Sequence, residues 1–322
     1  MKQFEFEQQN EPFWHAFEQE IISLENNKLD TKAKDFTQRY RRLCRQTAIA
    51  QSRQYSPSLV EDLNRLAARA HHILYRHQTP YLLRFGQWIK SDLPRQVRSE
   101  KTVVIWSHLL FYVPYIFFFV LCAIFPHWAN DLPGVQMERM QEMYRQMAEN
   151  IANNENRSFH TDLTMFGFYI FNNIGIAFKA VGSGFLFGIG TIYILLMNGY
   201  MMGAIEGAML HAEPATRLAF FSFVGAHGAF ELTGIVLSGA AGLRIGLALL
   251  APRGFSRKDA LKIQGKKAGQ LIAAAFLLLF IAAIFEAFWS SITVISPYFK
   301  MAVALCLWVA VYAYLIFGGR QK

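Results

Sequence analysis

Two ionisable side chains, His227 and Glu231, stand four residues apart inside an apolar, glycine-rich stretch. On a helix, this spacing places both side chains on the same face. Ionisable groups inside a membrane are costly unless they meet partners, so they mark structural or functional sites. Two kinds of chemistry are therefore open to this pair: a proton or ion relay, or a hydrogen-bonded lock that joins one helix to another.

A metal site is a third interpretation of His227 and Glu231, because zinc-binding helices also carry two ligands at this spacing. The second member of the pair is Glu and not His, and the sequence offers no evident third ligand. We therefore expect no metal and no cofactor. The sequence also lacks a nucleophile elbow, a phosphate-binding loop, an HExxH motif and paired cysteines, so we predict that the chain is not an enzyme.

A hydrogen-bonded lock needs partners on neighbouring helices, and asparagines in apolar surroundings can supply them. Asn172, Asn173 and Asn198 lie in such surroundings. Together with His227 and Glu231, they are predicted to form the polar core of the fold, with a structural or gating role.

Three further charged residues interrupt apolar stretches and form an alternative ion pathway: Glu286, Lys179 and Arg244. Lys179 and Arg244 fall near the inner ends of their predicted helices, from which long side chains can extend to the surface. Glu286 lies deeper, beside aromatic residues, where it is either neutral or paired with a neighbour.

The elements that must position these residues are long apolar helices. Hydrophobic residues make up 53% of the 322-residue chain and cluster in long runs, which is typical of membrane-spanning segments. The net charge of +9 does not indicate a nucleic-acid partner, because the basic residues flank the apolar runs as the positive-inside rule predicts. The predicted fold class is an all-α polytopic membrane protein with about six transmembrane helices and an N-terminal cytoplasmic helical domain.

The apolar runs divide the chain into six predicted parts. These are residues 1–98, a cytoplasmic helical domain that ends in an interfacial helix at 80–94; 99–127, the first transmembrane helix; 128–161, an extracytoplasmic amphipathic segment; 162–252, a glycine-rich membrane core of three spans; 253–268, a basic cytoplasmic loop; and 269–322, two C-terminal transmembrane helices. The last span of the core is too long for a simple crossing, so we predict that it is broken near residues 225–234. The basic clusters place both termini in the cytoplasm of a bacterium, with the chain in its inner membrane.

Small residues recur every four positions in two stretches, namely Gly199, Gly203 and Gly207 in the third span, and Ser238, Gly242 and Gly246 in the fourth. This spacing lets helix backbones approach closely. We expect the third and fourth spans to be tightly packed neighbours within one chain, and contact between two copies, as in a homo-oligomer, is the alternative.

The extracytoplasmic segment carries methionines at near-helical spacing between Met137 and Met147. Such a stripe is soft and adaptable, so it can pack onto its own protein or dock on a partner or on lipid. We expect the first of these, and keep the stripe as a candidate partner surface together with the arginine-rich cytoplasmic domain.

Four stretches of the membrane region carry a resemblance to a known family: FNNIGIAFKAVGSG, GIGTIYILLMNGYMMGA, AHGAFELTGIVLSGAAGLRIG and SRKDAL. They resemble the stage II sporulation protein M family, a group of bacterial polytopic membrane proteins. The segments LNRLAARAHHILYR and LPRQVRSEK resemble the longer, non-sporulation branch of that family.

The resemblance implies a function that the residues alone do not. The sporulation member of the family resides in the septal membrane and is implied to anchor cell-wall hydrolases there. We therefore expect this chain to be a membrane scaffold that anchors or organises envelope proteins, with the lipid bilayer and other membrane proteins as partners. The alternative is an ion- or proton-coupled transporter or channel that uses the buried His227 and Glu231.

Overall fold

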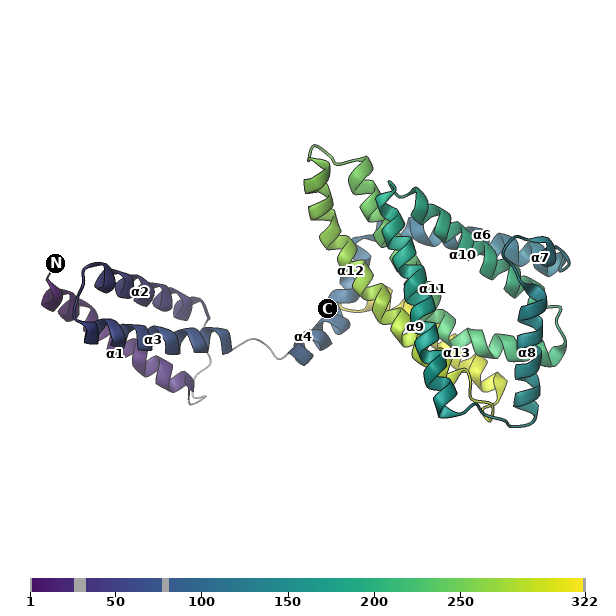
Figure 1. Ribbon diagram of the computed structural model, residues 1–322, viewed down its shortest axis with the longest axis horizontal. Helices are drawn as coiled ribbons and strands as arrows, with labels where there is room; N and C mark the ends of the chain where they lie inside the picture. The colour runs from purple at the N-terminus through teal and green to yellow at the C-terminus, as the bar shows by residue number, and fades with distance from the viewer. Residues whose placement is uncertain (1, 26–32, 77–80, 321–322) are drawn as a thin grey trace. The chain divides into compact units, whose positions relative to one another are not determined.

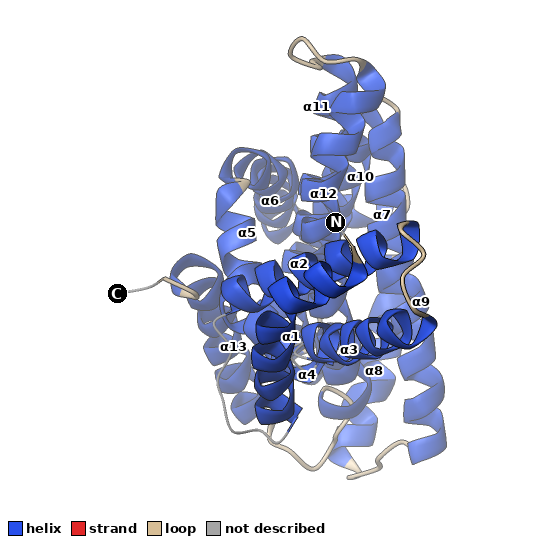
Figure 2. Cartoon of the chain, turned by 90° about the vertical axis from the view of Figure 1, so that its left-hand side faces the viewer, coloured by secondary structure: helices blue, strands red, loops and turns tan. Residues whose placement is uncertain are grey.

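The computed structural model describes residues 2–25, 33–76 and 81–320, and all regular structure in these residues is helical (Figures 1 and 2). The predicted all-α fold class is confirmed. The chain divides into two compact units, Met1–Gly86 and Gln87–Lys322. Each unit has its own hydrophobic core, so each is described by itself.

Three helices form the core of the first unit, α1 (Gln3–Glu25), α2 (Ala33–Ser52) and α3 (Pro57–Arg76). Each helix contributes apolar side chains to this core. The side chains buried most completely in it are Phe17, Ile21, Leu43, Ala50 and Ala70. Burial of apolar area of this kind is the main stabilising term in folding, so the unit has the means to hold its own structure.

A helical segment leads from residue 81 into the first membrane helix. It consists of α4 (Tyr81–Gln87), a π-helical turn η1 (Trp88–Asp92) and α5 (Leu93–Ser99). The predicted interfacial helix covers this segment, although its first residue, 80, lies outside the described residues. Leu82 and Phe85 of α4 are exposed, as a helix on a lipid surface requires, whereas Leu93 of α5 is buried in the core of the second unit.

Among the described residues, five helical segments are long and apolar enough to cross a membrane. They are α6 (Lys101–Ile124), α10 (Ile189–Met209), α11 (Pro214–Leu250), α12 with its π-helical extension η3 (Arg257–Trp289), and α13 (Pro297–Phe317). The predicted second span corresponds to α9 (Phe159–Gly182), which is not among the five. The polytopic membrane fold is confirmed, and the count of six is approximate.

The predicted basic loop at 253–268 is helical over most of its length, because α12 begins at Arg257. Ser256 caps this helix, since its Oγ accepts a hydrogen bond from the Asp259 backbone nitrogen at 3.1 Å. Ser256 and Asp259 have the three-residue spacing of a helix start. The prediction of a loop followed the basic composition of the segment and did not use this spacing. The apolar segment that begins with α12 ends at Trp289.

The long helix α11 lies in the middle of the membrane unit (Figure 1). Most of its side chains are buried. Its 37 residues form one uninterrupted helix of roughly 55 Å, so the predicted break near 225–234 is wrong. The glycines that suggested a break provide space for neighbours instead. A Cβ atom added at Gly234 would come within 2.7 Å of Leu279 on α12, and one added at Gly239 within 2.6 Å of Leu195 on α10. A helix longer than the hydrocarbon core can tilt or extend beyond it.

The two small-residue stripes differ in how far they match the predicted packing. In α10, Cβ atoms added to the stripe would clash with the backbone of α6, where Gly199, Gly203 and Gly207 face the carbonyls of Phe111, Tyr115 and Phe119. The stripe of the third span therefore packs on the first span and not on the fourth, so this part of the prediction is wrong. In α11, Gly242 faces Ala180 of α9 and Thr191 of α10, and Gly246 faces Gly188 just before α10, so the stripe of the fourth span does lie against the third. Ser238 donates a hydrogen bond within its own helix, to the Gly234 carbonyl. All these contacts lie within one chain, as expected.

The short segment α7 (Trp128–Asp131) and helix α8 (Met137–Ala152) form the predicted extracytoplasmic region. Met137 is buried, and Met140 and Met147 pack beside it against the same core as Tyr144. The Tyr144 ring meets Phe220 and Phe223 of α11 edge-on, at 4.9 and 5.9 Å between centroids. The stripe thus packs onto its own protein, and only Met143 of these methionines is strongly exposed. This packing leaves little of the stripe free for a partner.

Candidate functional site

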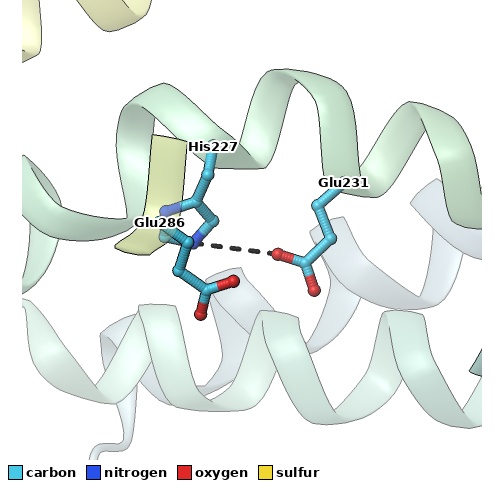
Figure 3. Close-up of side chains that lie close together, drawn as sticks. All are labelled: His227, Glu231 and Glu286. Carbon is cyan, nitrogen blue, oxygen red and sulfur yellow. Dashed lines mark ion pairs between the residues drawn. The ribbon is translucent and has the colours of Figure 1, made fainter. Parts of the chain in front are cut away.

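Three ionisable side chains from two elements meet in the interior of the membrane unit (Figure 3). His227 and Glu231 lie one turn apart on α11, and Glu286 comes from η3 (Phe285–Trp289). The ligand atoms of all three lie within 4.8 Å of one another. Figure 3 shows the side chains converging, with the His227 Nε2 and a Glu231 carboxylate oxygen 3.7 Å apart. The structure therefore adds Glu286 to the predicted pair of His227 and Glu231.

The position of Glu286 depends on a wide turn at the end of α12. Residues 285–289 form a π-helical turn, closed by a 2.8 Å hydrogen bond from the Ser290 nitrogen to the Phe285 carbonyl. Turns of this type are rare and occur often at functional sites. Sequence reasoning assigned Glu286 to a separate ion pathway, because a regular 3.6-residue periodicity gives no sign of this turn.

Asn173 connects α9 to this group. It is 1% exposed, and its Nδ2 donates a long hydrogen bond of 3.5 Å to a Glu286 oxygen. Asn172 is exposed, and its Nδ2 donates to the Asn173 Oδ1 at 3.1 Å. The structure thus brings five of the predicted site residues into one chain of contacts, and Asn173 provides the interhelical bond that the lock interpretation requires.

Two buried residues that sequence reasoning missed complete the surroundings. Ser290 Oγ lies 3.3 Å from His227 Nδ1, and the Ser290 carbonyl accepts a 2.8 Å hydrogen bond from the Lys300 ammonium. Lys300 is 2% exposed at the start of α13 and also donates to the Ile292 carbonyl. The signal in the sequence is a single lysine at the start of a long apolar run. Such a lysine is easily interpreted as a residue at the end of a membrane helix. Nearby on α8, burial raises the pKa of the Tyr144 hydroxyl.

The other predicted site residues lie elsewhere. Asn198 donates to the Ile194 carbonyl of its own helix and does not join the group. Lys179 is exposed. Arg244 belongs to a separate ion-paired cluster, in which its Nε lies 3.0 Å from Glu100 and the Lys267 ammonium lies 3.3 Å from the same carboxylate.

The charge balance of the site is unusual for a buried location. Glu231 is 8% exposed, and among the described residues it accepts no hydrogen bond. Across the residues that the structure describes, no lysine or arginine forms an ion pair with Glu231 or Glu286. A charged carboxylate inside a membrane unit is unfavourable unless it is neutralised. The site can be neutralised by sharing protons among its three members or by holding a cation.

Comparisons with known proteins agree with the division of the chain into a helical first unit and a membrane unit. A family model described as Stage II sporulation protein M matches residues 105–291, more than half of the chain, which includes the whole site. A second model, a domain of unknown function (DUF8413), matches residues 4–76, which form the first unit. Searches of curated proteins and of solved structures each found no match.

Proposed function

We propose that this chain, which belongs to the stage II sporulation protein M family, is an integral membrane anchor that holds or organises other proteins of the cell envelope. The observation that supports this proposal is the division of the chain into a membrane unit and a separate helical unit with its own core. A second unit with its own core is what an anchor needs in order to bind a partner without disturbing its membrane helices.

Charge indicates where the first unit would be. Arg95, Arg98 and Lys101 precede α6, and basic residues also precede and begin α12. By the positive-inside rule, we place both termini on the cytoplasmic side of a bacterial inner membrane. A cysteine introduced into α8 should then react with an impermeant label added from outside, and a lack of reaction would contradict this orientation.

The most suitable docking surface of the first unit is the exposed face of α2. Arg41 and Arg45 are one turn apart and exposed, and within the described residues neither forms an ion pair. By contrast, Arg39 is paired with Glu20 at 2.7 Å, and Arg42 lies over the Phe13 ring at 4.2 Å. Unpaired arginines favour a partner with an acidic surface, since guanidinium groups bind carboxylates in a bidentate manner.

The anchor proposal can be tested by crosslinking the full chain in native membranes, followed by purification and mass spectrometry. We expect a defined envelope protein to be captured, and to be lost when the charge is reversed by Arg41→Glu or Arg45→Glu. The matched control is Arg65→Glu, because Arg65 is also exposed and, among the residues that the structure describes, pairs only with Asp62 of its own helix. This single reversal should leave capture unchanged.

Three results are informative. Capture that is lost in the α2 variants and kept in the control supports both the anchor and its docking face. Capture kept in all variants supports an anchor whose docking face lies elsewhere. Self-crosslinks alone, with no second protein, contradict the anchor and leave a homo-oligomer as the finding.

A second candidate function is ion- or proton-coupled transport, favoured by one observation: two carboxylates and an imidazole lie among the membrane helices. Purified protein in liposomes should then conduct protons or cations, and Glu231→Gln should abolish the flux. Glu206→Gln is the matched control, because Glu206 is a spanning-helix carboxylate whose oxygen accepts a 2.6 Å hydrogen bond from Tyr115, outside the group. Liposomes without measurable flux would exclude this candidate.

A further inference from the structure

We propose that His227, Glu231 and Glu286 bind a divalent first-row transition-metal ion inside the membrane unit. The sequence-based expectation of no metal rested on the lack of a third ligand, and η3 supplies that ligand as Glu286. The site does not depend on the anchor function proposed above.

The distances suit an ion placed between the three side chains. Zinc lies about 2.0–2.2 Å from imidazole nitrogen and carboxylate oxygen, so three ligands spaced evenly around one ion lie about 3.4–3.8 Å apart. The 3.7 Å between His227 Nε2 and the Glu231 oxygen already fits this spacing. All three ligand atoms lie within 4.8 Å of one another, so a carboxylate shift of about 1 Å brings every pair to this spacing. Rotation about the last side-chain bonds of Glu286 is enough for such a shift.

Glu231 provides an independent reason to place a ligand here. The residue is 8% exposed, its carboxylate points into the group, and within the described chain no donor forms a hydrogen bond to it (Figure 3). Its nearest polar partner is His227 Nε2 at 3.7 Å, which is too long for a hydrogen bond. Buried carboxylates normally accept hydrogen bonds, so a carboxylate that accepts none and faces two other ligand groups is available to bind a cation.

The surroundings of His227 are those of a metal-bound histidine. A metal-bound imidazole usually donates its other ring N–H to an oxygen, which fixes the ring and its tautomer. Here Nδ1 lies 3.3 Å from Ser290 Oγ. When Nδ1 carries the proton, the Nε2 lone pair faces the Glu231 carboxylate, and two acceptors in that position repel each other unless a cation lies between them. Lys300 holds the Ser290 backbone by a hydrogen bond to its carbonyl.

Charge and ligand type decide the class of ion. Two carboxylates and a neutral imidazole carry a charge of −2, so one divalent ion neutralises the set of ligands itself. One nitrogen and two carboxylate groups suit Zn²⁺, Mn²⁺ or Fe²⁺, while Ca²⁺ prefers six to eight oxygen ligands and Mg²⁺ keeps several waters.

The proposal can be tested with the purified full-length protein in detergent, after treatment with a chelator. Zn²⁺ binding is measured by competition with a chromophoric chelator and by elemental analysis of the protein. We expect one tight site per chain, with an affinity reduced at least about 100-fold by Glu231→Gln or by Glu286→Gln, since changes in the outer shell alone cost 10–100-fold. Glu206→Gln, which removes a spanning-helix carboxylate outside the group, should leave the affinity unchanged.

Variants in a membrane core can fail to fold, so a measurement on the unaltered protein is also needed. X-ray absorption of the Zn²⁺-loaded protein should show one imidazole ligand together with oxygen ligands. A ligand shell without imidazole, binding that is equal in all variants, or no saturable binding would each overturn the proposal. Displacement of Zn²⁺ by equal concentrations of Mg²⁺ or Ca²⁺ would overturn the assignment to a transition metal.

Discussion

Replacement of Gly239 by alanine tests whether the glycines of α11 exist for close packing. Gly239 lies where α6, α10 and α11 meet, and an added Cβ would be 2.6 Å from both Leu195 and the Ser107 hydroxyl. Ordinary contacts of carbon atoms are about 3.5–4.0 Å, so neighbours would have to move by about 1 Å. Leu195 and Ser107 are both completely buried, so neither has free space into which it can move.

The expected cost of Gly239→Ala is the sum of three terms. Overpacking of a filled core costs about 1–3 kcal/mol. The Ser107 hydroxyl donates a 2.6 Å hydrogen bond to the Val236 carbonyl, and its loss would add about 1 kcal/mol. The better helix propensity of alanine offsets about 1 kcal/mol. We therefore expect Gly239→Ala to lower the free energy of unfolding by about 1–3 kcal/mol.

Gly228→Ala in the same helix is the matched control. Its added Cβ would meet only Trp308, at 3.8 Å, which is an ordinary contact. This variant should keep or slightly raise stability, because alanine favours the helix by up to about 1 kcal/mol. The assay is reversible unfolding of the purified proteins in mixed micelles. Equal stability of the two variants would refute the argument that added Cβ contacts decide the outcome along α11.

Three further predictions use the same unfolding assay. Gly203→Leu should destabilise the protein by at least about 3 kcal/mol, because its side chain would separate α10 from α6; an unchanged midpoint would contradict that packing. Glu100→Gln should lower the free energy of unfolding by about 3–5 kcal/mol, because it leaves the charge of Arg244 uncompensated. Lys267→Gln should lower it by less than about 1 kcal/mol, because Lys267 is half exposed. Equal effects of the two variants would contradict the argument from burial. Lys300→Met should cost about 1–3 kcal/mol, because it leaves two loop carbonyls without a donor; a stabilising effect would argue against it.

The fold class followed from the sequence because membrane helices have a strong compositional signal. Apolar runs of about 20 residues with basic flanks are typical of transmembrane helices. The helices of the first unit could be predicted from their amphipathic periodicity. Details that depend on packing did not follow. The glycine spacing of Gly199 and Gly203 indicated close contact, but nothing in that spacing names the partner helix, and the structure assigns it to α6.

The long helix α11 shows how one signal can support two structures. Glycines within a long apolar run indicate a break when they are considered alone, because glycine weakens helices. The same glycines stabilise a continuous helix when neighbours occupy the space of the absent side chains, as Leu279 does at Gly234. Only the positions of α10 and α12 distinguish the two cases, and these positions are not encoded locally.

Only part of the candidate site could be predicted from the sequence, for a related reason. His227 and Glu231 share one helix, so their spacing alone brought them together. Glu286 lies 55 residues beyond Glu231, in a turn that closes from i to i+5, so residues after it fall out of the regular helical phase. A straight span predicted over this region therefore cannot place Ser290 beside His227. The π-helical turn is thus the feature that places Ser290 beside the histidine of a three-ligand site. A deletion of Ala287, which would restore regular helical phase, should turn Ser290 away from His227 and weaken Zn²⁺ binding in the competition assay, even though all three ligand residues remain; unchanged affinity would contradict this role of the turn.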